Sequence, residues 1–159
     1  WVPVHTLVPH SKATSTMDGI NAIFARHEPL MTAHGIGTGI LYATVSTNAF
    51  VIEPVFFTPD ALTEIHKETV EGDVLARLPG FDANPAAANA TATVRQALID
   101  FFAEVGGVHL QIGKAYPYRD GLRPESWRVI SQIKQALDPG GRVNPGALGF
   151  GPETPEQND

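Results

Sequence analysis

The chain has 159 residues, of which 43% are hydrophobic and 18% charged, a composition typical of one globular domain that can bury a core. Its formal net charge is −6 and its eleven lysines and arginines are scattered, so neither a nucleic acid nor an anionic membrane is the expected partner. It contains no cysteine, which excludes disulfides and thiolate chemistry and fits a reducing, cytoplasmic compartment. No apolar run reaches the roughly 18–20 residues of a membrane span.

The two ends of the chain predict a fragment with one domain and a tail. The sequence opens at Trp1 inside a predicted strand, without Met and without the basic and apolar regions of a signal peptide. We therefore expect residues 1–150 to be one domain cut from a longer protein. Residues 151–159 are acidic, polar and rich in proline, which predicts a disordered tail.

The first elements are predicted from β-branched and helical periodicity. Residues 1–8 are typical of a strand, and Pro9 closes it. Apolar residues then recur at helical spacing over about residues 14–27, and Glu28-Pro29 predicts the end of that helix.

A hairpin is predicted next. Residues 35–45 and 48–57 have the pattern of two strands, joined at the polar residues 46–48. Because proline cannot donate to a strand ladder, Pro54 predicts that the second strand lies at a sheet edge or carries a bulge.

Two helices are predicted in the middle of the chain. Thr58-Pro59-Asp60 has the residues of a helix start, followed by a predicted buried stripe of Leu62, Ile65, His66, Thr69 and Val70. Residues 79–85 are predicted to be a connector. From Thr91 a second helix should run to Gly106-Gly107, with a buried stripe of Val94, Ala97, Leu98, Phe101, Phe102 and Val105.

The remaining elements complete the fold prediction. Residues 108–112 are typical of a fourth strand, and Pro124 opens a last helix that Asp138-Pro139-Gly140-Gly141 stops. Its apolar face would consist of Trp127, Ile130, Ile133 and Leu137. The order of elements indicates an α+β fold, a ferredoxin-like antiparallel sheet covered on one face by helices, with a carboxyl-terminal helix and tail.

The candidate functional residues are concentrated in residues 108–119. His109 is either a packed or surface histidine, or a base of near-neutral pKa. Strand alternation would place His109 and Gln111 on one face. Nearby, Lys114, Tyr116 and Arg119 supply donors and cations that suit an anionic substrate.

Two further observations concern a carboxylate and a metal. Glu53 stands in an otherwise apolar strand, so it should be paired, exposed at an edge, or part of a substrate site. No metal site is predicted, because the other histidines are dispersed without ligand spacing: His5, His10, His27, His34 and His66.

The carboxyl end resembles a known family. The run 133–146, with Lys134, Asp138-Pro139 and Asn144-Pro145-Gly146, resembles the closing signature of FAD-linked oxidases of the vanillyl-alcohol-oxidase type. Gly107-Val108-His109, followed by Gly113-Lys114, is similar to the histidine segment that lies upstream of that signature in the family.

The resemblance implies the α+β cap domain of a flavoprotein, in which a separate domain of the same protein binds FAD. It implies that His109 is catalytic, that Lys114 or Arg119 meets the substrate, and that Asn144 and Gly146 run toward the cofactor. The activity implied is oxidation of a 2-hydroxy acid such as D-lactate or glycolate, or of a phenolic or benzylic alcohol. Val108 stands where members acting on 2-hydroxy acids commonly have Glu, and the family's cap metal segment is missing, so both substrate classes stay open.

The alternative is a stand-alone ferredoxin-like α+β module that binds or regulates and does not catalyse. Such modules commonly pair through their sheets, so a homodimer is possible. In that case the histidine segment would be structural and Asn144-Pro145-Gly146 would be only a turn.

Overall fold

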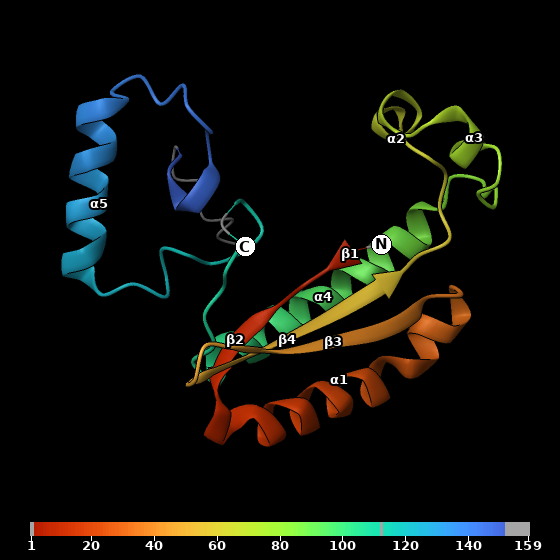
Figure 1. Cartoon of the computed structure of the whole chain (residues 1–159), viewed down its shortest axis with the longest axis horizontal. Coiled ribbons are helices and arrows are strands. Elements are labelled where there is room, and N and C mark those ends of the chain that lie inside the picture. Colours follow the sequence, from red (N-terminus) through yellow and green to blue (C-terminus); the bar gives the residue numbers. More distant parts are fainter. Residues whose placement is uncertain (1, 112, 152–159) are drawn as a thin grey trace, which may run out of the picture.

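The computed structural model describes residues 2–111 and 113–151, and an antiparallel sheet lies at its centre (Figure 1). β1 (Val2–Pro3) and β2 (Thr6–Pro9) follow each other along one side of β4 (Ala49–Phe57). β3 (Gly37–Val45) pairs along the other side of β4, as the predicted hairpin requires. The predicted α+β fold with an antiparallel sheet is confirmed.

β4 is the central strand, so the prediction that Pro54 marks an edge or a bulge is wrong. The register of β4 with β1 and with β2 is continuous, without an extra residue on either strand. The carbonyl of Pro54 accepts a bond from Val4 N at 2.9 Å, but proline has no N–H to return to Val4. The ladder is therefore interrupted at Val4 and His5, which separates β1 from β2.

The predicted fourth strand, residues 108–112, is reduced to one bridge. Leu7 and Val108 exchange two backbone bonds, of 2.7 Å and 3.0 Å, and Ile112 lies outside the described residues. This bridge lies beside β2, so the order across the sheet is Val108, β1–β2, β4 and β3. That is the order of a ferredoxin-like sheet, but the segment after Val108 has no ladder to hold it.

α1 (Ala13–Ala33) and α4 (Pro85–Glu104) cover one face of the sheet (Figure 1). They cross closely at Gly19, where a Cβ would come within 2.1 Å of the Phe101 ring. The prediction that α1 ends at Pro29 is wrong, because the helix continues for another turn in which Met31 is buried against the core. The largest buried side chains between helices and sheet are Phe56, Phe102, Ile20, Ile52, Leu98, Val4, Val8 and Val94.

The prediction that a helix starts at Thr58 is wrong. The side chains of Thr58 and Asp60 bond to α4 and to its cap residue Asn84 instead. The Thr58 hydroxyl lies 2.8 Å from the Thr91 hydroxyl, and Asp60 Oδ1 accepts Asn84 N at 2.7 Å. Two short helices follow, α2 (Glu64–Thr69) and α3 (Gly72–Leu75). They contain no buried residue, so the predicted buried stripe is wrong as well.

α4 is longer than predicted at its amino end. It begins at Pro85, where the Asn84 side chain accepts Ala87 N at 3.0 Å. Its predicted carboxyl end is confirmed, and Gly106 there has the left-handed φ of 72° that favours glycine. Gly107 is needed for another reason, since a Cβ on it would lie 1.9 Å from the Thr6 hydroxyl.

The carboxyl-terminal part forms a lobe of its own. α5 (Pro124–Leu137) has the predicted bounds, and the Trp127 ring stacks on Phe150 with centroids 4.7 Å apart, beside the short η2 (Ala147–Gly149). The predicted apolar face of α5 is only partly covered, and Leu137 is 82% exposed. Of the predicted disordered tail, residues 152–159 lie outside the described residues.

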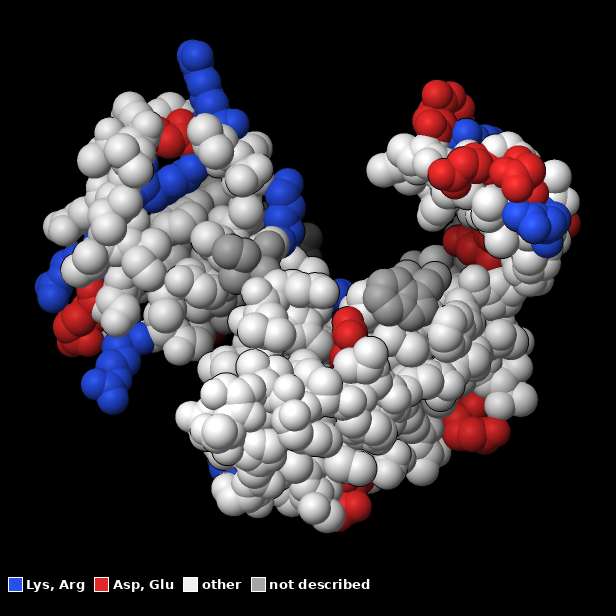
Figure 2. Space-filling view, in the orientation of Figure 1, with Lys and Arg blue, Asp and Glu red and all other residues white. Residues whose placement is uncertain are grey.

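Two lobes stand above the sheet layer in the view of Figure 2. One, at the left, contains α5 and the loop after it, and the other, at the right, contains α2 and α3. Most charged side chains in this view belong to the lobes, while the surface between them is largely uncharged. Among the described residues, no helix combines the length and the apolar character that crossing a bilayer requires.

Candidate functional site

Five side chains meet beside β1 and β2, where the fourth strand of the sheet would otherwise continue. We call them the histidine–tyrosine cluster: His5, Arg95, His109, Gln111 and Tyr116. Three of them come from the irregular segment after Val108, one from the gap between β1 and β2, and one from α4. The cluster therefore lies where strand pairing is interrupted twice, between β1 and β2 and again after Val108.

His5 is the most connected member, with a side chain that is 2% exposed. Its Nε2 atom lies 2.6 Å from Leu110 N and 3.2 Å from Gln111 N. Because both of these are N–H donors, Nε2 is the acceptor, and the proton of the neutral ring is on Nδ1. Nδ1–H then donates to the Tyr116 hydroxyl at 2.9 Å.

His109 is fixed in one tautomer by the main chain. Its Nδ1 atom lies 2.8 Å from the carbonyl oxygen of His5. A carbonyl only accepts, so Nδ1 carries the proton, and Nε2 of the neutral ring keeps its lone pair. The His109 ring also lies against Tyr116, with centroids 4.5 Å apart. The arrangement leaves Nε2 of His109 as the basic atom of the cluster.

Tyr116 closes the cluster on the other side. Its hydroxyl donates a weak bond of 3.4 Å to Gln111 Oε1, and the Arg95 guanidinium lies 5.9 Å from the centre of its ring. Arg95 Nε also donates to Pro3 O at 3.2 Å, which ties α4 to β1. Glu53 is close by, because the register of β4 with β1 and β2 places it opposite His5 on the same face of the sheet.

The surroundings keep the two imidazoles and the tyrosine of the cluster uncharged. Burial, and then the neighbouring His109, lower the pKa of His5 from 6.5 to about 4. Burial also lowers the pKa of His109, although its bond to the His5 carbonyl opposes the change. Burial raises the pKa of the Tyr116 hydroxyl, and the neighbouring His5 backbone and the charge of Arg95 oppose the rise. At neutral pH both imidazoles are therefore uncharged bases and Tyr116 keeps its proton.

The sheet face next to the cluster is apolar and open in part. Alternation places Val51, Val55 and Phe57 of β4 on the side opposite the helices, together with Leu41 of β3. Val51 and Val55 are mostly covered, but Leu41 is 51% and Phe57 52% exposed. Val108, which the bridge to Leu7 places on this face, is exposed as well.

Two predicted substrate residues lie outside the cluster, against the carboxyl-terminal loop. The Lys114 side chain passes Gly146, where a Cβ would be 3.6 Å from its Cε atom. Arg119 lies over the Trp127 ring at 5.3 Å and packs on Gly149. The structure thus brings Glu53, His109 and Tyr116 together around His5, and places Lys114 and Arg119 beside the loop that follows α5.

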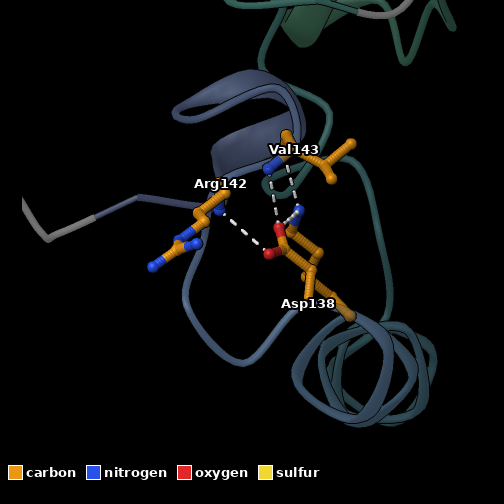
Figure 3. A network of polar contacts seen from close by, with 4 residues as sticks. Asp138, Arg142 and Val143 are labelled. Carbon is orange, nitrogen blue, oxygen red and sulfur yellow. Dashed lines mark hydrogen bonds and ion pairs between the residues drawn. The ribbon is translucent and has the colours of Figure 1, made fainter.

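The loop after α5 is held by Asp138 (Figure 3). Its carboxylate accepts Arg142 N and Val143 N at 2.9 Å each, and Lys134 Nζ at 2.5 Å. Lys134 Nζ also donates to the carbonyl of Val143 at 2.7 Å. The bond from Lys134 and those from the two amides lower the pKa of Asp138 to about 2. Lys134 and Asp138 of the sequence signature therefore build the loop.

Asn144 and Gly146, the predicted cofactor residues, lie in the same loop. Asn144 has a φ of 47° and its carbonyl accepts Ala147 N at 3.1 Å. Gly146 N–H donates to Phe150 O at 2.7 Å, so this amide is already bonded within the chain. Their assignment to a cofactor stays a prediction.

A pocket of about 650 Å³, lined in part by Arg95, lies between α4 and the segments that flank α2 and α3. Val2, Leu62, Leu78 and Phe81 give it apolar walls. In residues 2–111 and 113–151, no three His, Asp or Glu side chains converge as metal ligands would.

No protein family, curated protein or solved structure matches this chain. The resemblance at the carboxyl end therefore rests on the quoted motifs alone.

Sequence reasoning missed two members of the cluster, His5 and Arg95. His5 was set aside with the dispersed histidines, although it faces Glu53 across the sheet. That pairing depends on the register between strands that are far apart in the chain, which one sequence does not contain. Arg95 carried no signal, because its neighbours on α4 account for the buried stripe of that helix.

Proposed function

We propose that this chain is the substrate-binding cap domain of an FAD-dependent oxidoreductase, and that it is inactive without the domain that binds FAD. The observation that carries the proposal is the histidine–tyrosine cluster, a neutral histidine with a lone pair on Nε2, placed beside an open apolar sheet face. The motifs 107–114 and 133–146 support the same assignment by resemblance.

The chain's residues fit a role in covering a flavin better than a role in holding its phosphates. Leu41 and Phe57 expose an apolar surface against which a planar ring packs well. Of the two residues that the resemblance assigns to the cofactor, Asn144 and Gly146, the latter has its backbone amide bonded to Phe150 O. We therefore assign the ring side of the cofactor to this chain and the phosphates to another domain.

The proposed reaction is oxidation of a hydroxyl-bearing or benzylic carbon. When bound, FAD supplies the acceptor for the hydride that leaves that carbon with its electron pair. The hydroxyl proton of the substrate passes to His109 Nε2 as the carbonyl forms, which is general base catalysis. Glu53, Tyr116, Lys114 and Arg119 are the candidates for orienting the substrate, a 2-hydroxy acid such as D-lactate or glycolate, or a phenolic alcohol.

A titration of the chain itself with FAD tests whether another domain makes the contacts with the cofactor's phosphates. We expect weak binding, with a dissociation constant far above the protein concentration, because the phosphate contacts belong elsewhere. Tight binding of one FAD per chain would contradict the assignment as a cap.

In the full-length protein, His109→Asn should reduce turnover roughly 100-fold or more while leaving the melting temperature nearly unchanged.

The open sheet face is also the observation that favours the alternative, a ferredoxin-like module that pairs with a second copy without catalysis. In that case Leu41 and Phe57 would be buried in a dimer. Sedimentation of the chain distinguishes the two, because a cap domain should be monomeric and Leu41→Glu should change nothing. Conversion of a dimer to a monomer by Leu41→Glu would favour the module.

A further inference from the structure

We propose that His5 is the positioning residue of the site, which holds the segment carrying His109 and fixes the proton positions in His109 and Tyr116. This inference rests on the proposed function insofar as it gives His109 a catalytic task. It adds a residue from the first strand, far from the motifs that carry the family resemblance.

The segment needs such support because its strand is missing. After the bridge between Leu7 and Val108, the described backbone of this segment, which leaves out residue 112, no longer pairs with the sheet. The next two amides with described partners, those of Leu110 and Gln111, donate to the His5 imidazole at 2.6 Å and 3.2 Å. One side chain therefore replaces the ladder bonds that a fourth strand would have made.

His5 also determines where the protons are. Its Nε2 accepts two amides, so its Nδ1–H must donate, and the Tyr116 hydroxyl receives that bond and points its own proton at Gln111 Oε1. Its main-chain carbonyl holds Nδ1–H of His109 at 2.8 Å. As a result, both the lone pair of His109 Nε2 and the hydroxyl proton of Tyr116 are fixed through His5.

A neutral histidine is the side chain that suits this task. It offers an acceptor on one ring nitrogen and a donor on the other, and both are used here. The groups that face it are His109 and Tyr116 from the segment, Glu53 from β4 and, behind Tyr116, Arg95 from α4. A charged His5 would turn an N–H toward two amide donors and break the arrangement.

Two polar substitutions separate the inference from a general loss of packing. A glutamine at position 5 reaches the position of Nε2 and can accept the amides of Leu110 and Gln111. An asparagine reaches only the position of Nδ1 and leaves both amides without a partner. His10→Asn is the matched control, because His10 is an exposed histidine that follows the opposite end of β2, in the short helix η1 (His10–Lys12).

The first measurement is made on the chain without FAD. Nitrogen-15 spectra should show His109 protonated at Nδ1, and the amides of Leu110 and Gln111 should exchange slowly. In His5→Asn these amides should exchange at least tenfold faster. The residue-5 carbonyl remains, but the loosened segment no longer holds His109 against it, so His109 should lose its fixed Nδ1–H tautomer. His5→Gln and His10→Asn should behave like the wild type. Slow exchange and an unchanged His109 tautomer in folded His5→Asn would overturn the proposal.

The second measurement uses the full-length protein with its FAD. The rate of flavin reduction should fall roughly 100-fold in His5→Asn, with little change in KM, and His5→Gln should recover most of the loss. If the wild type reduces flavin and His5→Asn does so equally well, the positioning role is refuted and the proposed function stands. If the wild type reduces no flavin with any substrate of the proposed classes, the proposed function fails, and the catalytic task given to His5 fails with it.

Discussion

Acid should unfold this protein through His5. The pKa of His5 is about 4 in the folded chain, where the ring is buried, and about 6.5 once it is exposed. The unfolded state therefore binds the proton first, and the stability that His5 contributes is complete above pH 6.5. It is lost as the pH falls from 6.5 to 4.

The difference of about 2.5 pKa units corresponds to about 3 kcal/mol, since one unit is worth about 1.4 kcal/mol. The lowered pKa of His109 acts in the same direction. The carboxyl groups of Asp60 and Asp138 have lowered pKa values, so in the folded chain they take up their protons below pH 4. They therefore add little to the loss of stability between pH 6.5 and 4.

The assay is urea unfolding, followed by circular dichroism, at several pH values from 7.5 to 4.5. Wild type should lose on the order of 2–3 kcal/mol of unfolding free energy over this range. His5→Gln has no titrating group at this position and should lose much less, whereas His10→Gln should follow the wild type. Parallel curves for wild type and His5→Gln would refute the assignment of the acid sensitivity to His5.

Three further substitutions test the packing and the loop. Gly19→Ala should lower the unfolding free energy by about 1–3 kcal/mol in urea titrations, because its Cβ would overlap the Phe101 ring. Gly107→Ala should cost a similar amount, about 1–3 kcal/mol, because its Cβ would meet the Thr6 hydroxyl, and an unchanged midpoint would show that the backbones are further apart. Asp138→Ala should speed hydrogen exchange of the two loop amides at pH 5. The wild-type loop should stay protected until the pH falls from about 4 toward 2, where the Asp138 carboxylate takes up its proton.

Most of the architecture was predictable from local patterns. The hairpin of β3 and β4, the bounds of α5 and the glycine end of α4 follow from alternation, helix starts and the left-handed preference of glycine. The errors have tertiary causes. Pro29 stays inside α1 because the turn after it buries Met31, and Thr58 starts no helix because its hydroxyl is bonded to Thr91.

The site was only half predictable. Glu53 stands out in the sequence because it interrupts an apolar strand, and His109 and Tyr116 because polar and cationic residues concentrate in residues 108–119. The structure gathers the three. His5 does not stand out, because its role depends on a broken ladder opposite Pro54 and on a fourth strand that fails to form. Both features are consequences of strand pairing over long sequence separations, which residue patterns do not encode.

The most direct test of the central claim is flavin reduction by the full-length protein. It should purify with FAD, and its flavin absorbance should bleach under anaerobic conditions with D-lactate, glycolate or a para-substituted phenol. His109→Asn should retain the flavin and bleach roughly 100-fold more slowly. A full-length protein that contains no flavin, or a His109→Asn variant that bleaches at the wild-type rate, would contradict the account.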